Sequence, residues 1–239
     1  MNYFNMYKIE DIVNKIHCAD CLDFMKQMPD KCVDLVITSP PYNLGNGHHT
    51  GNTRHSAYDD DLPEVEYQTQ QIAVLNELYR IVKDTGSLIY NHKNRINQGK
   101  SITPYEWLLK TKWTLKQELV WFNGSQNFDK IRFYPMTERI YWLAKSPDTV
   151  LENKINHHDL FKWNAVGTGT THTRAFPSDL VESFVVCFPQ AQIVLDPYMG
   201  SGTVARVARD NQRDFIGIEI SPEYCKIAED RLKQQVLNF

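Results

Sequence analysis

The 239-residue sequence has no run of apolar residues that approaches the roughly 20 needed by a membrane-spanning helix. Its first residues, Met1 to Asn5, lack the pattern of a secretory signal. It also has only five cysteines, an odd number that cannot all pair in disulfides. Cys18 and Cys21 form a Cys-x-x-Cys pair, but no second pair follows to complete a structural zinc site. We therefore expect reduced thiols, no metal site and a cytoplasmic location.

Apolar residues make up 42% of the chain, enough for a sizeable core without disulfides or metals. Strand and helix patterns alternate, which favours an α/β fold with a mostly parallel sheet and helices on both faces. We expect strands at 15–18, 33–37, 87–90, 191–196 and 215–220, an antiparallel hairpin at 119–122 and 140–144 at one edge, and helices at 21–28, 72–82, 180–188 and 222–236. Residues 1–239 are expected to form a single domain.

The most informative segment joins an apolar strand to two prolines, an aromatic ring and an amide: residues 36–43 read Val-Ile-Thr-Ser-Pro-Pro-Tyr-Asn. Prolines fix φ and favour an extended preceding residue, so Ser39, the Pro40 carbonyl and Tyr42 should be held rigidly where the strand ends. An exocyclic amino group of a nucleobase needs two acceptors and a ring that stacks on the base. The segment predicts a site for such a group, although a Pro-Pro turn with a buried tyrosine could have the same sequence.

A second strand ends in Asp196 and enters the loop Pro-Tyr-Met-Gly-Ser-Gly-Thr at 197–203. Gly200 and Gly202 lack side chains where a ligand could approach the backbone. The helix that opens near Thr203 directs free N–H groups at an anionic group. The loop therefore predicts a binding site for a cofactor carboxylate or phosphate.

Together the two segments resemble the amino-group DNA methyltransferases that use S-adenosyl-L-methionine. Residues 39–42 match the catalytic motif of that family, and residues 196–202 match its cofactor loop. The catalytic motif comes first, as in the circularly permuted β class. The resemblance implies a Rossmann-like methyltransferase fold and site-specific methyl transfer to the exocyclic amino nitrogen of a base flipped out of double-stranded DNA.

In such an enzyme Ser39 and the Pro40 carbonyl would accept the two amino N–H groups, which favours a pyramidal nitrogen with its lone pair aimed at the methyl group. Pro41 belongs to the same motif, and Tyr42 would stack on the flipped base. Serine at the first position is commoner in cytosine-N4 enzymes, whereas Asp or Asn predominates in adenine-N6 enzymes. Cytosine N4 is therefore the favoured target and adenine N6 the alternative.

The resemblance also implies a set of cofactor-binding residues. They are Asp20, Phe176, Ser178, Asp196, Tyr198, Gly200, Ser201, Gly202, Thr203 and Glu219. Glu219 would bind the ribose hydroxyls, and Asp20, chosen over Asp23, would contact the adenine amino group. From the residues alone, Glu219 could instead be a charge before a helix, and Pro177 the first turn of a helix without a ligand role.

The net charge of −3 is unevenly distributed. Residues 1–79 carry 5 Lys/Arg against 12 Asp/Glu, whereas residues 80–145 carry 12 against 5. The central segment could therefore be an ordinary solvated surface or a basic surface that meets DNA phosphates. The candidate DNA contacts are Lys93, Arg95, Lys112, Lys130 and Arg132.

Two segments do not follow the alternation of strands and helices. Residues 43–65 are polar and rich in glycine, which predicts a long mobile loop with a functional role. Residues 122–175 have room for a short target-recognition region, so a homodimer or a partner subunit is considered. Gly200, Gly202 and Ala205 also fit the fingerprint of a dinucleotide-binding oxidoreductase, but that fold usually places the loop early and needs further sheet after it, so this class is disfavoured. A catalytically silent DNA-binding subunit is the other alternative, and the intact Ser-Pro-Pro-Tyr segment and glycine loop argue against it.

Overall fold

The computed structural model describes residues 7–44, 60–124, 133–153, 158–163 and 176–233. Its strands are β1 (Lys15–Cys18), β2 (Val33–Thr38), β3 (Val82–His92), β4 (Arg95–Asn97), β5 (Lys100–Ile102), β6 (Thr114–Phe122), β7 (Thr137–Ala144), β8 (Leu160–Lys162), β9 (Ile193–Asp196) and β10 (Asp214–Glu219). Its helices are α1 (Ile9–Ile12), α2 (Cys21–Met25), α3 (Glu64–Ile81), α4 (Tyr105–Leu108), α5 (Ser178–Val185), α6 (Thr203–Asp210) and α7 (Pro222–Lys233). Within this described part, no helix has the length and hydropathy of a membrane span.

The described strands form one eight-stranded sheet in the order β1-β10-β9-β2-β3-β7-β6-β8 and a separate hairpin of β4 and β5. The five strands β1, β10, β9, β2 and β3, in this spatial order, are all parallel to their neighbours. Strand β7 is antiparallel to both β3 and β6. The expected α/β sheet with an antiparallel hairpin is confirmed. The short strand β8, which pairs in parallel with β6 outside that hairpin, was not predicted.

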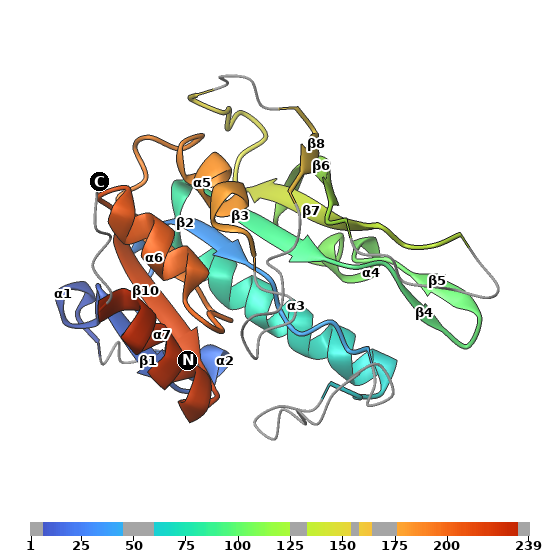
Figure 1. Cartoon of the computed structure of the whole chain (residues 1–239), viewed down its shortest axis with the longest axis horizontal. Helices are drawn as coiled ribbons and strands as arrows, with labels where there is room; N and C mark the ends of the chain where they lie inside the picture. Colours follow the sequence, from blue (N-terminus) through green and yellow to red (C-terminus); the bar gives the residue numbers. More distant parts are fainter. Residues whose placement is uncertain (1–6, 45–59, 125–132, 154–157, 164–175, 234–239) are drawn as a thin grey trace.

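Helices cover both faces of the sheet because its central strands are apolar on both sides. In β2, Leu35 and Ile37 pack in one cluster with residues of α5, α6 and α7. Val36, which points to the opposite face, packs with α2, α3 and α4. Figure 1 shows α5, α6 and α7 on one side of the sheet and α3 on the other.

Several element boundaries differ from the sequence-based expectation. The helix expected at 21–28 ends at Met25, because the N–H groups of Gln27 and Met28 bond to carbonyls three residues back and tighten the chain into turns. Helix α3 starts at Glu64, inside the segment expected to be a loop, and passes directly into β3 at Val82. Residues 45–59 of that loop lie outside the described residues, as do parts of the expected recognition region. Elements α1, α4, β4 and β5 were not predicted.

The parallel strands β9 and β2 lie side by side in the middle of the sheet, and the chain adds its next strand on opposite sides of this pair. From β9 the chain continues through α6 to β10 on one side, and from β2 through α3 to β3 on the other (Figure 1). In open α/β sheets, ligands bind at the carboxyl ends of the strands at such a switch point. Both sequence motifs directly follow these two strands.

Candidate active site

Asp196, the last residue of β9, is tied to Thr38, the last residue of β2. The Thr38 hydroxyl donates to Asp196 Oδ1 at 2.8 Å, across 158 positions of sequence, and the Tyr198 N–H donates to the same oxygen at 3.1 Å. Asp196 is only 4% exposed and has no cationic partner within the described residues. Burial raises the pKa of its carboxyl group to about 7. A buried carboxyl without a cation beside it fits a ligand that brings an ammonium group.

The two glycines of the loop after β9 have left-handed backbone conformations, with φ of 53° at Gly200 and 80° at Gly202. A Cβ on Gly202 would lie 2.9 Å from the Cβ of Ala228 in α7, so this glycine lets the loop pack closely on that helix. A Cβ on Gly200 would meet nothing within 4 Å. The open space beside Gly200 is therefore where a ligand can approach the loop backbone.

We expect Gly202→Ala to lower the stability of the protein by about 2–4 kcal/mol, because it combines backbone strain with a clash. Gly200→Ala should cost only about 1 kcal/mol of strain but should weaken binding of a ligand in the open space. Urea unfolding and calorimetric titration with S-adenosyl-L-methionine measure the two effects. Unchanged affinity in Gly200→Ala would contradict the placement of the ligand.

Glu219, the last residue of β10, holds the glycine loop in place. Its Oε2 accepts from the Gly200 N–H at 2.8 Å, and its Oε1 accepts from the Ser221 N–H at 2.9 Å. Each carboxylate oxygen has a second lone pair that can accept from a ribose hydroxyl. The structure is therefore compatible with both interpretations of Glu219. It precedes α7, as expected of a charge before a helix, and its oxygens can still accept from ribose hydroxyls beside the glycine loop.

The remaining loop residues are fixed by neighbouring helices. Arg231 of α7 donates to the hydroxyl and the carbonyl of Ser201, at 2.6 and 2.7 Å. Thr203 is 5% exposed and begins α6. Tyr198 interacts with the thiol of Cys21 at the start of α2, and burial raises the pKa of that thiol to about 12. These contacts make the loop a rigid part of the fold.

The other expected cofactor residues have structural roles that the sequence did not reveal. Asp20 caps α2 by accepting from the Asp23 N–H at 3.0 Å, and it follows β1 at the same edge as Glu219. Phe176 is buried and packs against Trp121, with ring centroids 5.9 Å apart. The Ser178 hydroxyl accepts a hydrogen bond from Arg206 of α6.

Residues 39–42 after β2, which the sequence predicts to be the catalytic segment, are held by buried polar groups. Ser39 Oγ lies 2.7 Å from the Tyr42 hydroxyl, which donates to Glu138 Oε2 at 2.8 Å. Glu138 lies at the start of β7, and Asn91, near the end of β3, donates from Nδ2 to the same Oε2 at 2.8 Å. Within the described residues, the Pro40 carbonyl has no hydrogen-bond partner. Among the residues that the structure describes, the segment thus presents a carbonyl without a hydrogen-bond partner beside a positioned hydroxyl.

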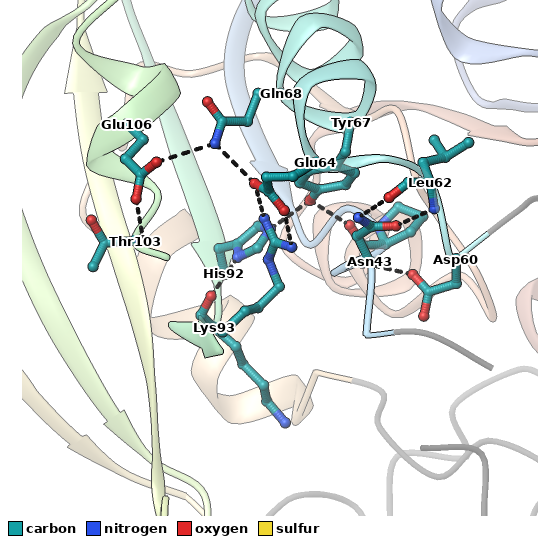
Figure 2. A network of polar contacts seen from close by, with 12 residues as sticks. Asn43, Asp60, Leu62, Glu64, Tyr67, Gln68, His92, Lys93, Thr103 and Glu106 are labelled. Carbon is teal, nitrogen blue, oxygen red and sulfur yellow. Dashed lines mark hydrogen bonds and ion pairs between the residues drawn. The ribbon is translucent and has the colours of Figure 1, made fainter. Parts of the chain in front are cut away.

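A second group fixes the next residues of the segment. The Tyr67 hydroxyl of α3 donates to the Pro41 carbonyl at 2.7 Å and lies 2.6 Å from Nε2 of His92 (Figure 2). Burial lowers the pKa of His92 to about 3, so the ring is neutral with a single N–H, and its Nδ1 lies 2.7 Å from the Lys93 carbonyl. The His92 ring packs against the ring of Tyr42, with centroids 4.8 Å apart. The orientation of Tyr42 is therefore fixed from two sides.

Asn43 links the described residues that precede and follow positions 45–59. Its side chain accepts from the Leu62 N–H at 2.7 Å and donates to the Leu62 carbonyl at 2.9 Å, while its own N–H donates to Asp60 at 2.7 Å. Figure 2 shows these contacts beside the first turn of α3. The ends of the predicted loop are therefore anchored next to the catalytic segment.

Residues 33–230 match the protein family described as DNA methylase, the N6 and N4 amino-group enzymes. The chain belongs to this family. It is 28% identical to the type II methyltransferase M.ScaI of Streptomyces caespitosus, over 96% of this chain and 84% of that protein. It is also 28% identical to M.HinfI of Haemophilus influenzae, over 95% of this chain and 70% of that protein.

Solved structures confirm the methyltransferase fold. PvuII DNA methyltransferase, described as cytosine-N4-specific, matches with a TM-score of 0.77 at 19% identity, covering 93% of this chain and 87% of that one. M1.HpyAVI in complex with S-adenosylmethionine matches with a TM-score of 0.64 at 21% identity, covering 92% and 99%. S-adenosyl-L-methionine is the methyl donor of this family. The methionine part of this molecule carries an ammonium group. Such a cation could lie beside the buried carboxyl group of Asp196, which has no cationic partner in the part of the chain that the structure describes.

The structure describes three of the five basic residues that were expected to contact DNA, and two of these three are turned toward the protein interior. Arg95 is 6% exposed and forms a two-pronged ion pair with Glu64 at 2.8 Å, so its guanidinium does not face solvent. Lys93 turns inward, with its Nζ 3.0 Å from Glu138 Oε1. Lys112 is exposed. Lys130 and Arg132 lie outside the described residues.

Three residues of the methylase site were missed in the sequence: Thr38, Asn91 and Glu138. A signal was present for each. Thr38 is the last residue of the apolar strand before Ser39, and Asn91 directly follows the expected strand at 87–90. Glu138 lies two residues before the expected strand at 140–144. Polar residues at the ends of apolar strands are candidates for a site at that edge of the sheet.

Proposed function

We propose that this chain transfers the methyl group of S-adenosyl-L-methionine to the exocyclic amino nitrogen of a base flipped out of double-stranded DNA, with cytosine N4 as the target. The observation that carries the proposal is the meeting of two groups at the switch point. The acceptors Ser39 Oγ and the Pro40 carbonyl follow β2, and the buried Asp196 ends the adjacent β9. Amino group and methyl donor would thus be bound side by side.

The cofactor supplies an electrophilic methyl group, and the residues of this chain bind and orient. Asp196 would face the ammonium, the backbone at Gly200 would border the methionine part, and Glu219 would accept from the ribose hydroxyls. Phe176, Ser178, Ser201 and their neighbours would form the walls of this site. Asp20, exposed at the end of β1, would contact the adenine amino group.

The lone pair of an aromatic amino nitrogen is delocalised into the ring, which makes it a weak nucleophile. Two acceptors on its N–H groups favour pyramidal geometry and direct the lone pair at the methyl group. Ser39 and Pro40 would provide these acceptors at fixed positions, while Tyr42 stacks on the base. The chemistry needs no covalent intermediate with the protein.

The choice of cytosine rests on Ser39, since a serine stands where an amide or carboxylate is usual for adenine. Nucleoside mass spectrometry on methylation-free genomic DNA, incubated with the protein and S-adenosyl-L-methionine, tests the choice. N4-methylcytosine supports the proposal, whereas N6-methyladenine supports the reaction and overturns the base. Neither product, with cofactor binding demonstrated by calorimetry, would indicate a silent DNA-binding subunit.

A further inference from the structure

Glu138, at the start of β7, is hydrogen-bonded to Tyr42 of the catalytic segment. Its carboxylate accepts further hydrogen bonds from asparagine side chains and forms an ion pair with a lysine. Its Oε2 accepts from Tyr42 and Asn91, each at 2.8 Å. Its Oε1 accepts from Asn123 at 3.0 Å and pairs with Lys93 at 3.0 Å. Glu138 is 4% exposed. A carboxylate that faces an ammonium and three hydrogen-bond donors is surrounded by groups to which it can only be an acceptor.

This carboxylate determines the direction of the hydrogen bonds that lead to Ser39. Tyr42 has a single hydroxyl proton, and at 2.8 Å from Glu138 Oε2 that proton must point at the carboxylate. The Tyr42 oxygen then has only lone pairs for the contact of 2.7 Å with Ser39 Oγ, so the Ser39 proton must point at Tyr42. Among the described residues, Ser39 Oγ then accepts only the long contact of 3.3 Å from Asn91, so a lone pair remains for a substrate.

Asn91 supports the same direction. Its Nδ2 group donates to Glu138 and also contacts the Tyr42 hydroxyl and, at 3.3 Å, Ser39 Oγ. Its Oδ1 is buried and has no partner within the described residues. The reversed amide would place Oδ1 against the carboxylate, which is worse than an unpaired carbonyl oxygen. The carboxylate therefore fixes this amide as a donor as well.

We propose that Glu138 is a positioning residue that acts through Tyr42 to make Ser39 a hydrogen-bond acceptor toward the target amino group. Because an amino group that reacts through its lone pair must donate both N–H groups, a Ser39 that donated its own proton would face it with the wrong polarity. Glu138 does not touch the substrate in this arrangement. The inference rests on the proposed function, since it concerns how the amino group is bound.

Glu138→Gln tests the direction of these hydrogen bonds with little change in shape. The introduced amide must present its NH2 group either to Lys93 and Asn123 or to Tyr42 and Asn91. In the second case Tyr42 accepts from the introduced amide and donates to Ser39, so Ser39 donates to the substrate. We expect the single-turnover rate of methyl transfer to fall about 100-fold, with the dissociation constant for S-adenosyl-L-methionine close to that of the wild type.

A double-mutant cycle separates this role from a merely structural one. Tyr42→Phe removes the middle hydroxyl but keeps the ring, so the rate should also fall. Adding Glu138→Gln to Tyr42→Phe should then cause a much smaller loss than it causes in the wild type, because only the long contact of Asn91 with Ser39 still links Glu138 to the serine. Independent, additive losses would overturn the proposal. So would a Glu138→Gln rate equal to the wild type.

Glu118→Gln is the matched control. Glu118 lies on the adjacent strand β6, pairs with Arg139 at 2.9 Å and accepts from the Tyr105 hydroxyl at 2.6 Å, and neither partner belongs to the catalytic segment. The rate of this variant should equal the wild type. If Glu138→Gln fails to fold, Tyr42→Phe alone decides, since an unchanged rate in that variant also overturns the proposal. A wild-type protein that methylates no DNA would instead refute the proposed function.

Discussion

Asp196→Asn is expected to weaken binding of S-adenosyl-L-methionine by about 10- to 100-fold and to make the unliganded protein more stable at neutral pH. Thr38 and Tyr198 both donate to Oδ1, so an asparagine can keep both hydrogen bonds through its carbonyl oxygen. Its NH2 group then replaces Oδ2. There it would meet the ammonium of the cofactor as one donor against another. Calorimetric titration and thermal unfolding measure the two effects.

The gain in stability follows from the pKa of Asp196, which burial raises from 3.8 to about 7. Between these values the folded protein holds a proton that the unfolded chain has lost. Wild-type stability should therefore fall as the pH rises from about 4 to about 7 and level off above that. The asparagine variant lacks this loss. Cofactor affinity of the wild type should rise between about pH 6 and 8, because an ammonium favours the ionised carboxylate.

Asp214→Asn provides the comparison. Asp214 is exposed at the opposite end of β10, where it accepts from the Asn14 side chain at 2.6 Å. Its variant should bind the cofactor like the wild type. An Asp196→Asn variant with wild-type affinity would contradict the role of Asp196, and a less stable variant at pH 7 would contradict the raised pKa.

The sequence predicted those parts of the site whose chemistry is local. A strand followed by Ser-Pro-Pro-Tyr and a strand followed by a glycine loop are recognisable within a few residues of sequence. The resemblance to a family then placed the two segments in one site, and the hydrogen bond between Thr38 and Asp196 shows why they meet. The parallel strands and most of the helices were predicted from apolar periodicity.

The site residues that the sequence did not predict depend on pairings between residues far apart in the chain. Asn91 and Glu138 come together because β3 and β7 run antiparallel, with Asn91 opposite Ile140 and His92 opposite Arg139. No local pattern predicts that register. Arg95 was expected to contact DNA because a count of charges cannot distinguish an exposed arginine from one buried against Glu64, 31 residues away.

Ser39→Ala is expected to slow methyl transfer at least about 100-fold while cofactor affinity stays near that of the wild type. The hydroxyl is one of two acceptors proposed for the amino group, and the structure ties it to Tyr42 and Asn91, not to the glycine loop. Alanine leaves the Pro40 carbonyl as the single acceptor, so the nitrogen lone pair is poorly directed. Single-turnover kinetics at saturating cofactor isolate this step from binding.

Ser87→Ala tests whether loss of a buried serine hydroxyl is enough to produce that effect. Ser87 lies in the middle of β3, opposite Leu35 of β2, where its hydroxyl accepts from Trp142 at 3.1 Å. Its variant should lose stability, because the indole N–H is left unpaired, but the folded enzyme should keep its rate. If Ser39→Ala, Tyr42→Ala and Asp196→Ala all lost cofactor affinity equally, the two ends of the site would act as one unit. The division between a base-binding segment after β2 and a cofactor-binding loop after β9 would then be wrong.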